Sequence, residues 1–161
     1  MSAEERIEAA ITALLSRLEG LPSEALYREP SYGEWPAMST LAHVVEMLPY
    51  WAKQCQGIAN DPGQPFGRTH DDPGRLGAIA AHAADPVEAV RTNLQSSAHE
   101  ALVILRGIPR AAWEKAGQHV RRGTMTIDEV VDEFMVRHVE SHAAQVDEAL
   151  RALGYSPSQV P

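Results

Sequence analysis

Residues 126–145 read TIDEVVDEFMVRHVESHAAQ and combine the periodicity of a buried helix with two histidines, His138 and His142, one helical turn apart. Thr126 followed three residues later by Glu129 is typical of a capping box at a helix start. At about 100° per residue, one arc collects Ile127, Val131, Phe134, His138, His142 and Ala149. The opposite arc collects Glu129, Glu133, Arg137, Glu140, Asp147 and Arg151. The pattern predicts a helix that continues to Gly154 and turns both histidines toward the protein interior.

Three further segments, over residues 3–18, 40–58 and 86–105, have helical periodicity with apolar stripes. Ser2 with Glu5 predicts a capping box for the first segment, and Ser39 is the expected N-cap of the second. Asp85 and Pro86 predict the start of the third, as N-cap and first helical residue. Strand signals are nearly absent, because no run alternates β-branched residues and no Asn-Gly or Asp-Gly turn occurs.

The connections between these segments, over residues 21–38, 59–84 and 107–125, exceed the usual length of bundle loops. The middle connection is rich in proline and glycine and is expected to be loop. Four amphipathic helices are best buried by packing on one another. We therefore predict an all-α four-helix bundle with long connections, as one domain over residues 1–161. Connections of this length permit crossovers, so an up-down-up-down order is not required.

The composition excludes several functional classes. The chain has 161 residues, of which 44% are hydrophobic, and its formal net charge of −8 argues against a nucleic-acid surface. No apolar run is long enough to span a membrane, and no signal-peptide pattern follows the polar N-terminus. A single cysteine, Cys55, rules out an internal disulfide and suits a reducing compartment. We expect a cytoplasmic protein that binds neither nucleic acid nor membrane.

The histidines carry the strongest functional signal. His138 and His142 can converge on one ion, and His43 lies at the edge of the apolar arc of the second segment. Three neutral imidazoles are suitable ligands for zinc, nickel, iron or copper, and they leave coordination positions of the ion free for water or substrate. The competing interpretation is a network of buried, hydrogen-bonded core histidines. His119 is kept as a reserve ligand, whereas we expect no role for His70, His82 and His99.

Other residues near His43 can be interpreted either as functional or as structural. Glu46 could orient a ligand or act as a general base, although a solvated helix glutamate is the commoner case. Tyr50 and Trp51 are expected in the core or in a pocket wall rather than in catalysis. Pro49 removes a backbone hydrogen bond inside the helix and predicts a kink that either opens a pocket or only bends the helix. Cys55 is expected to be a buried hydrophobe rather than a nucleophile.

Two stretches resemble the DinB/YfiT superfamily of helical-bundle metalloenzymes. One is Glu34-Trp35-Pro36 followed by Leu41-Ala42-His43-Val44-Val45-Glu46 and Tyr50-Trp51. The other runs from Thr126-Ile127-Asp128-Glu129 to Arg137-His138-Val139-Glu140-Ser141-His142-Ala143-Ala144-Gln145. Their order and spacing match over essentially the whole chain. The resemblance implies a three-histidine metal site on His43, His138 and His142, and often a homodimer.

The resemblance also implies a range of activities. Some relatives are S-transferases or isomerases that use low-molecular-weight thiols, and others resemble hydrolases. The leading hypothesis is a metal-dependent enzyme, a thiol-dependent S-transferase or a hydrolase, acting on a small molecule. The first alternative is a non-catalytic metal- or small-ligand-binding stress protein. The second is a structural, dimerising bundle with a buried histidine network.

Overall fold

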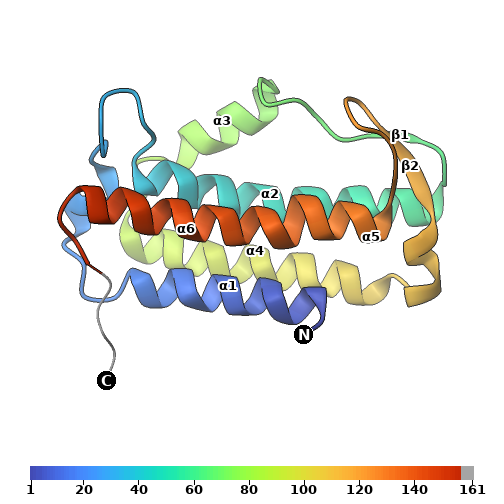
Figure 1. The fold of residues 1–161 in the computed structure, drawn as a ribbon, viewed down its shortest axis with the longest axis horizontal. Helices are drawn as coiled ribbons and strands as arrows, with labels where there is room; N and C mark the ends of the chain where they lie inside the picture. Colours follow the sequence, from blue (N-terminus) through green and yellow to red (C-terminus); the bar gives the residue numbers. More distant parts are fainter. Residues whose placement is uncertain (157–161) are drawn as a thin grey trace.

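The computed structural model describes residues 1–156; residues 157–161 of the predicted domain lie outside the described part. Within that part, four long helices dominate: α1 (Ala3–Arg17), α2 (Ala37–Asn60), α4 (Val87–Gly107) and α6 (Arg137–Ala152). The last is preceded by α5 (Ile127–Val130) and a π-helical segment (Val131–Val136), which together continue one helical rod. The predicted four-helix bundle is therefore confirmed (Figure 1).

The order of the helices around the bundle explains the long connections. Helix α2 packs against α4 and α6, and α1 packs against the same two helices, so α1 and α2 stand on a diagonal. Figure 1 shows α2 and α4 running in one direction and α1 and α6 in the other. Because α2 and α4 are parallel neighbours, the chain must return along the full length of the bundle between them. That return path is residues 61–86.

The return connection holds structure that the sequence pattern did not predict. Helix α3 (Pro73–His82) follows Asp72, whose side chain accepts a hydrogen bond from the Arg75 N–H. Strand β1 (Pro65–Phe66) pairs in parallel with β2 (Ala116–His119), which pairs antiparallel with β3 (Gly123–Thr126). The expectation that this connection is entirely loop was wrong, and the three short strands form a small sheet beside the predicted helices. Strands of two and four residues are too short to show the alternation on which strand prediction depends.

The starts of the helices follow the predicted chemistry in two cases of four. Both capping boxes, Ser2 with Glu5 and Thr126 with Glu129, are present. Helix α2 begins at Ala37, before the predicted cap Ser39, and Pro36 precedes it. Asp85 makes no cap for α4, and its carboxylate bonds the His82 ring at 2.6 Å instead. Helix α2 continues through Pro49.

One apolar core joins the helices. Leu14 of α1, Leu48 of α2, Leu94 of α4 and Met135 of the π-helical segment are all fully buried. Two shorter 3₁₀ turns, Ser23–Tyr27 and Arg110–Glu114, close the other connections and bury Leu26 and Trp113. Among the described residues, no helix combines the length and the apolarity needed to cross a membrane.

Candidate metal centre

The three histidines singled out from the sequence lie together between two helices. His43 projects from α2, and His138 and His142 project from α6 one turn apart. One ring nitrogen of each lies within 4.8 Å of those of the other two. The ring centroids are 5.3 Å apart for His43 and His138, 4.8 Å for His43 and His142, and 4.6 Å for His138 and His142. The arrangement is compact enough for one ion to touch all three rings.

In the His43 and His142 rings, a hydrogen bond to one nitrogen leaves the other nitrogen available to bind a metal. The Nδ1 of His43 lies 2.8 Å from Oε1 of Glu46, and the Nδ1 of His142 lies 2.9 Å from Oε1 of Gln145. Each oxygen is an acceptor, so each Nδ1 is the donor, and in the neutral ring the Nε2 keeps its lone pair. Both Nε2 atoms are buried without a hydrogen-bond partner among the described residues. Unpaired buried nitrogens are costly, and a metal ion would satisfy them.

Glu46 is held on its far side by Arg68. The Nη2 of Arg68 lies 2.7 Å from each carboxylate oxygen of Glu46, and both side chains are only 10% exposed. The Arg68 guanidinium also stacks over the Tyr50 ring at 3.8 Å. The commoner reading of Glu46 as a solvated glutamate was therefore wrong, and the structure fits the alternative of a carboxylate that orients His43. A carboxylate behind a histidine is the usual support of a metal ligand.

The rings on α6 are neutral over a wide pH range. Burial, with the neighbouring histidines and Arg75, lowers the pKa of His138 to about 3, against a backbone hydrogen bond to Phe134 that raises it. Burial also lowers the pKa of His142 to about 4, opposed by its bond to Gln145. Only a neutral imidazole has a lone pair for a metal, so both rings are ready for ligation at neutral pH.

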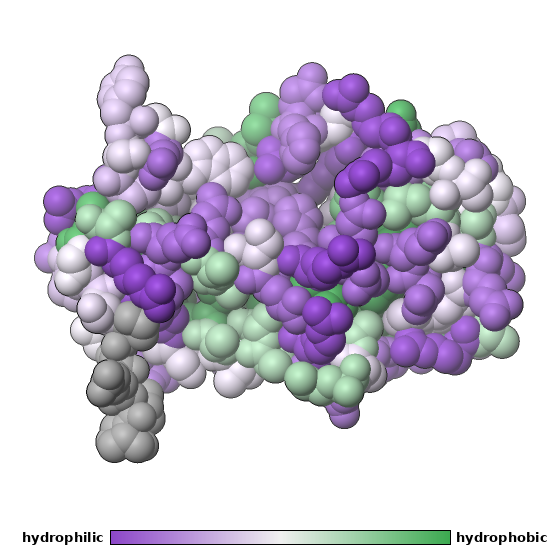
Figure 2. Space-filling model, viewed as in Figure 1, coloured by the Kyte–Doolittle hydropathy of each residue, from purple (hydrophilic) through white to green (hydrophobic). Residues whose placement is uncertain are grey.

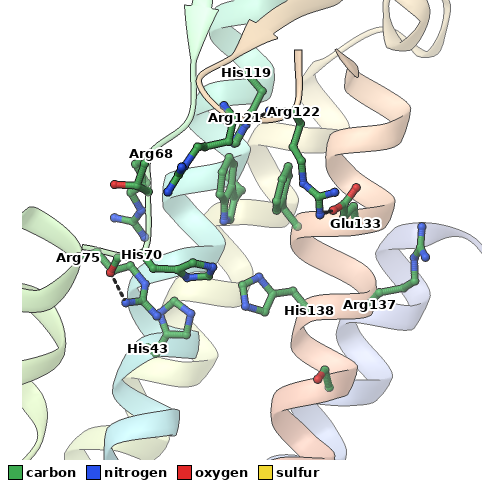
Figure 3. A pocket seen from close by; sticks show the side chains of 14 residues that line it. His43, Arg68, His70, Arg75, His119, Arg121, Arg122, Glu133, Arg137 and His138 are labelled. Atoms are coloured by element: carbon green, nitrogen blue, oxygen red, sulfur yellow. Dashed lines mark hydrogen bonds and ion pairs between the residues drawn. The ribbon is translucent and has the colours of Figure 1, made fainter. Parts of the chain in front are cut away.

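A cavity of about 600 Å³ opens beside the cluster. Helix α2 contributes His43 and Trp51 to its wall, and α6 contributes His138 and Ser141. Trp51 is therefore a pocket wall, as predicted, whereas Pro49 and Tyr50 are absent from the described lining. The rest of the lining comes from the return connection, the β2–β3 hairpin, the π-helical segment and the first residue of α6: Arg68, Thr69, His70, Arg75, His119, Arg121, Arg122, Glu133, Phe134 and Arg137 (Figure 3).

Most of this second group was missed by sequence analysis. His70 was assigned no role, yet it lines the pocket. Glu133 and Arg137 were placed on the face opposite the histidines, yet both lie at the pocket rim. Arg68 and Arg75 sit in a connection that was expected to be loop. The one available signal was the polar run from Arg68 to Asp72, enclosed by Gly67 and Pro73.

His119, the reserve ligand, lies outside the three-histidine group. It is on strand β2 and stacks with Phe134 at a ring-centroid distance of 5.1 Å. Its Nδ1 accepts the backbone N–H groups of Arg121 and Arg122, each at 3.1 Å. Burial and the charge of Arg122 lower the pKa of this ring. A neutral His119 therefore carries its proton on Nε2, which is buried without an acceptor among the described residues and has no lone pair for a metal.

Comparisons with known proteins agree with the fold. The family model described as the DinB superfamily matches residues 6–146. The structure of YfiT from Bacillus subtilis, described as a probable metal-dependent hydrolase with an unusual four-helix bundle topology, superimposes with a TM-score of 0.78. The two share 15% identity, over 96% of this chain and 87% of that one. A mycothiol-dependent maleylpyruvate isomerase gives a TM-score of 0.70 at 18% identity, over 95% and 68%. No curated protein sequence matches this chain.

Proposed function

This chain belongs to the DinB superfamily, and on that basis we propose that it is a metal-dependent enzyme with His43, His138 and His142 as the ligands of one divalent ion. The observation that carries the proposal is the pair of orphaned Nε2 atoms, on His43 and His142, whose opposite nitrogens are fixed by Glu46 and Gln145. A core network of histidines would be expected to pair these nitrogens. Zinc, nickel and iron all accept such a donor set.

The chemistry follows from the three-ligand count and from the cavity. A divalent ion on three histidines lowers the pKa of a water or thiol at an open position and so supplies a nucleophile at neutral pH. The cavity beside His43 and His138 is large enough for a small organic substrate. Trp51 and Phe134, stacked with their ring centroids 4.3 Å apart, form an apolar part of its wall.

Two reactions fit this site, and the identity of the nucleophile separates them. If the nucleophile is water, the enzyme is a hydrolase, the activity described as probable for YfiT. If the nucleophile is a low-molecular-weight thiol, the enzyme is an S-transferase or an isomerase, as the mycothiol-dependent relative is. Burial raises the pKa of the Cys55 thiol to about 12. The chain therefore offers no reactive thiol of its own, and a thiol reaction needs one from solution. The homodimer implied by the family resemblance stays a prediction.

The test is turnover by protein purified without an affinity tag and reconstituted with zinc, nickel or iron. Hydrolysis of an activated ester is compared with the reaction of a small thiol with an electrophile. We expect one of the two to depend on added metal and to fall at least 100-fold in His138→Ala, while His82→Ala, at the end of α3, keeps it. Bound metal without turnover in either assay would favour the non-catalytic binding protein instead.

A further inference from the structure

The pocket beside the histidines has a charge opposite to that of the chain. Its described lining holds one acidic side chain, Glu133, against five arginines: Arg68, Arg75, Arg121, Arg122 and Arg137. The whole protein has a formal net charge of −8. Figure 2 shows the same face, where strongly hydrophilic side chains gather around a hollow above α6. A positive cavity in an acidic protein concentrates anions from solution.

Three of these arginines already have carboxylate partners. Arg68 pairs with Glu46, Arg122 with Glu133, and Arg137 with Asp132. Arg75 and Arg121 are different, because neither has a carboxylate within ion-pair distance in the described part of the chain. Arg121 is close enough to Asp71 to help lower the pKa of that carboxyl, although the Thr69 hydroxyl is the main cause. Two cations therefore reach the pocket with most of their hydrogen-bonding capacity unused.

Arg75 is the nearer of the two to the histidines. Figure 3 shows its guanidinium beside His43, with one bond donated from Nη1 to the His70 carbonyl at 2.8 Å. Its charge contributes to the lowered pKa values of His138 and His142. Burial lowers the pKa of Arg75 itself. A half-buried guanidinium without a carboxylate loses solvation that a bound anion would replace.

Arg121 lies on the other side of the pocket, on the β2–β3 hairpin. Its backbone N–H is fixed by the His119 Nδ1, but its side chain is exposed. Figure 3 places Arg121 and Arg75 on different elements that face the same space. A molecule that fills this cavity can therefore meet one guanidinium near the histidines and a second near the hairpin.

We infer that the substrate is a small organic molecule with two oxyanion groups, one bound by Arg75 beside the histidines and the other by Arg121. The inference rests on the proposed function, because it gives the substrate class of the same site. The planar fork of arginine matches carboxylate and phosphate equally well, so the shared chemistry is a doubly anionic, oxygen-bearing molecule. The experiment separates the two sources.

The test is isothermal titration calorimetry on the metal-loaded protein at constant ionic strength. The probes are succinate with two carboxylates, phosphoglycolate with a carboxylate and a phosphate, butyrate with one carboxylate, and uncharged dimethyl succinate. We expect succinate or phosphoglycolate to bind at least tenfold more tightly than butyrate, with no detectable binding of the diester. The tighter binder of succinate and phosphoglycolate identifies the second oxyanion group as carboxylate or phosphate.

Arginine variants locate the binding. Arg75→Gln and Arg121→Gln should each weaken the dianion at least tenfold. Arg121→Gln should leave butyrate unchanged, because that probe has only the group bound near the histidines. The matched control is Arg106→Gln, which removes the same charge from an exposed pair with Glu8 and should change nothing. Arg75→Lys keeps the positive charge but loses the paired N–H donors of the guanidinium. It replaces Arg75→Gln in the test if that variant does not fold.

The metal content of each sample separates this inference from the proposed function. Dianion binding that is unaffected by either substitution, or matched by the diester, overturns the inference even when the metal is present. If the protein takes up no metal but still binds the dianion through Arg75 and Arg121, the inference holds and the metal-dependent function is overturned. If Arg106→Gln also loses dianion binding, the weaker binding of the pocket variants comes from the change in net charge alone, and the inference is overturned.

Discussion

The two walls of the pocket are built in different ways. The helical wall, with His43, His138 and His142, belongs to helices whose other faces form the bundle core, and burial lowers the pKa of the His138 and His142 rings. The facing wall comes from the return connection and the β2–β3 hairpin and carries charged arginines, of which Arg121 and Arg122 are exposed and Arg68 and Arg75 are partly buried. This difference fits the two proposals made above, in which the helical wall would provide the metal ligands and the facing wall would bind the substrate.

The contrast has a physical basis. A packed helix holds a side chain within a narrow range of positions, which suits ligands that must meet at one point. A connection is constrained less tightly, and charged side chains tolerate that because their attraction acts over a longer distance than a metal bond. Glu46 and Arg68 join the two walls, since the carboxylate on α2 contacts both His43 and the arginine of the connection.

The largest expected difference between the walls is in metal affinity. Replacing His43, His138 or His142 by alanine should lower metal affinity by more than the roughly 10- to 100-fold that loss of a supporting partner costs. Arg75→Gln, His70→Ala and His82→Ala should retain the metal. Competition with a chromogenic chelator measures each affinity. Equal metal content in His138→Ala and the unmodified protein would contradict the assignment of the helical wall.

The helical wall was largely predictable from sequence, and the facing wall was not. His138 and His142 fall on one helical arc four residues apart, and periodicity alone brings them together. His43 required only that its helix pack against theirs. Arg75 and Arg121 reach the pocket through a parallel helix pair, a ten-residue helix and strands of two to four residues. Periodicity predicts the two helices of the pair but not their parallel arrangement, and strands this short leave no periodic signal, so the placement of both arginines depends on tertiary contacts distant in sequence.

The second expected effect tests the link between the walls. Glu46→Gln keeps the size of the side chain but weakens its bonds to His43 and Arg68, so metal affinity should fall by roughly 10- to 100-fold. The matched control is Glu100→Gln, which removes a carboxylate from an exposed pair with Lys53. The chelator competition assay measures both variants. Unchanged affinity in Glu46→Gln would show that the carboxylate does not support the histidine.

The third expected effect concerns the metal-free protein in acid. His138 and His142 have folded-state pKa values of about 3 and about 4, below their usual value, so the unfolded chain binds more protons as pH falls below about 6.5. The free energy of unfolding should therefore be intact above pH 6.5 and should decrease toward pH 5, by on the order of 2 kcal/mol for each histidine.

Urea denaturation at pH 7 and pH 5 measures this decrease, in a range where most carboxylates stay ionised. His138→Asn, which has no titrating ring, should lose part of the pH dependence, whereas His82→Asn should keep it. If His138→Asn and the unmodified protein lose the same stability between the two pH values, the ring is not held neutral by burial.

The smallest expected effect concerns the core behind the helical wall. The Cys55 thiol is fully buried, and its pKa is raised to about 12, so almost no thiolate forms at pH 8. The folded protein should react with iodoacetamide far more slowly than the urea-unfolded protein, as followed by intact mass. Cys55→Ala should keep the metal content and any thiol-dependent activity. Rapid labelling of the folded protein would place a reactive thiol within reach of solvent.

The most direct test of the account is a crystal structure of the protein purified without a tag, with anomalous diffraction recorded at the absorption edges of zinc, nickel and iron. We expect one anomalous peak per chain, bound by His43, His138 and His142 and open toward the cavity between α6 and Arg75. Elemental analysis of the same sample should give one ion per chain. A fourth protein side chain closing the coordination would make the site structural, and no peak among the three histidines would contradict the metal centre.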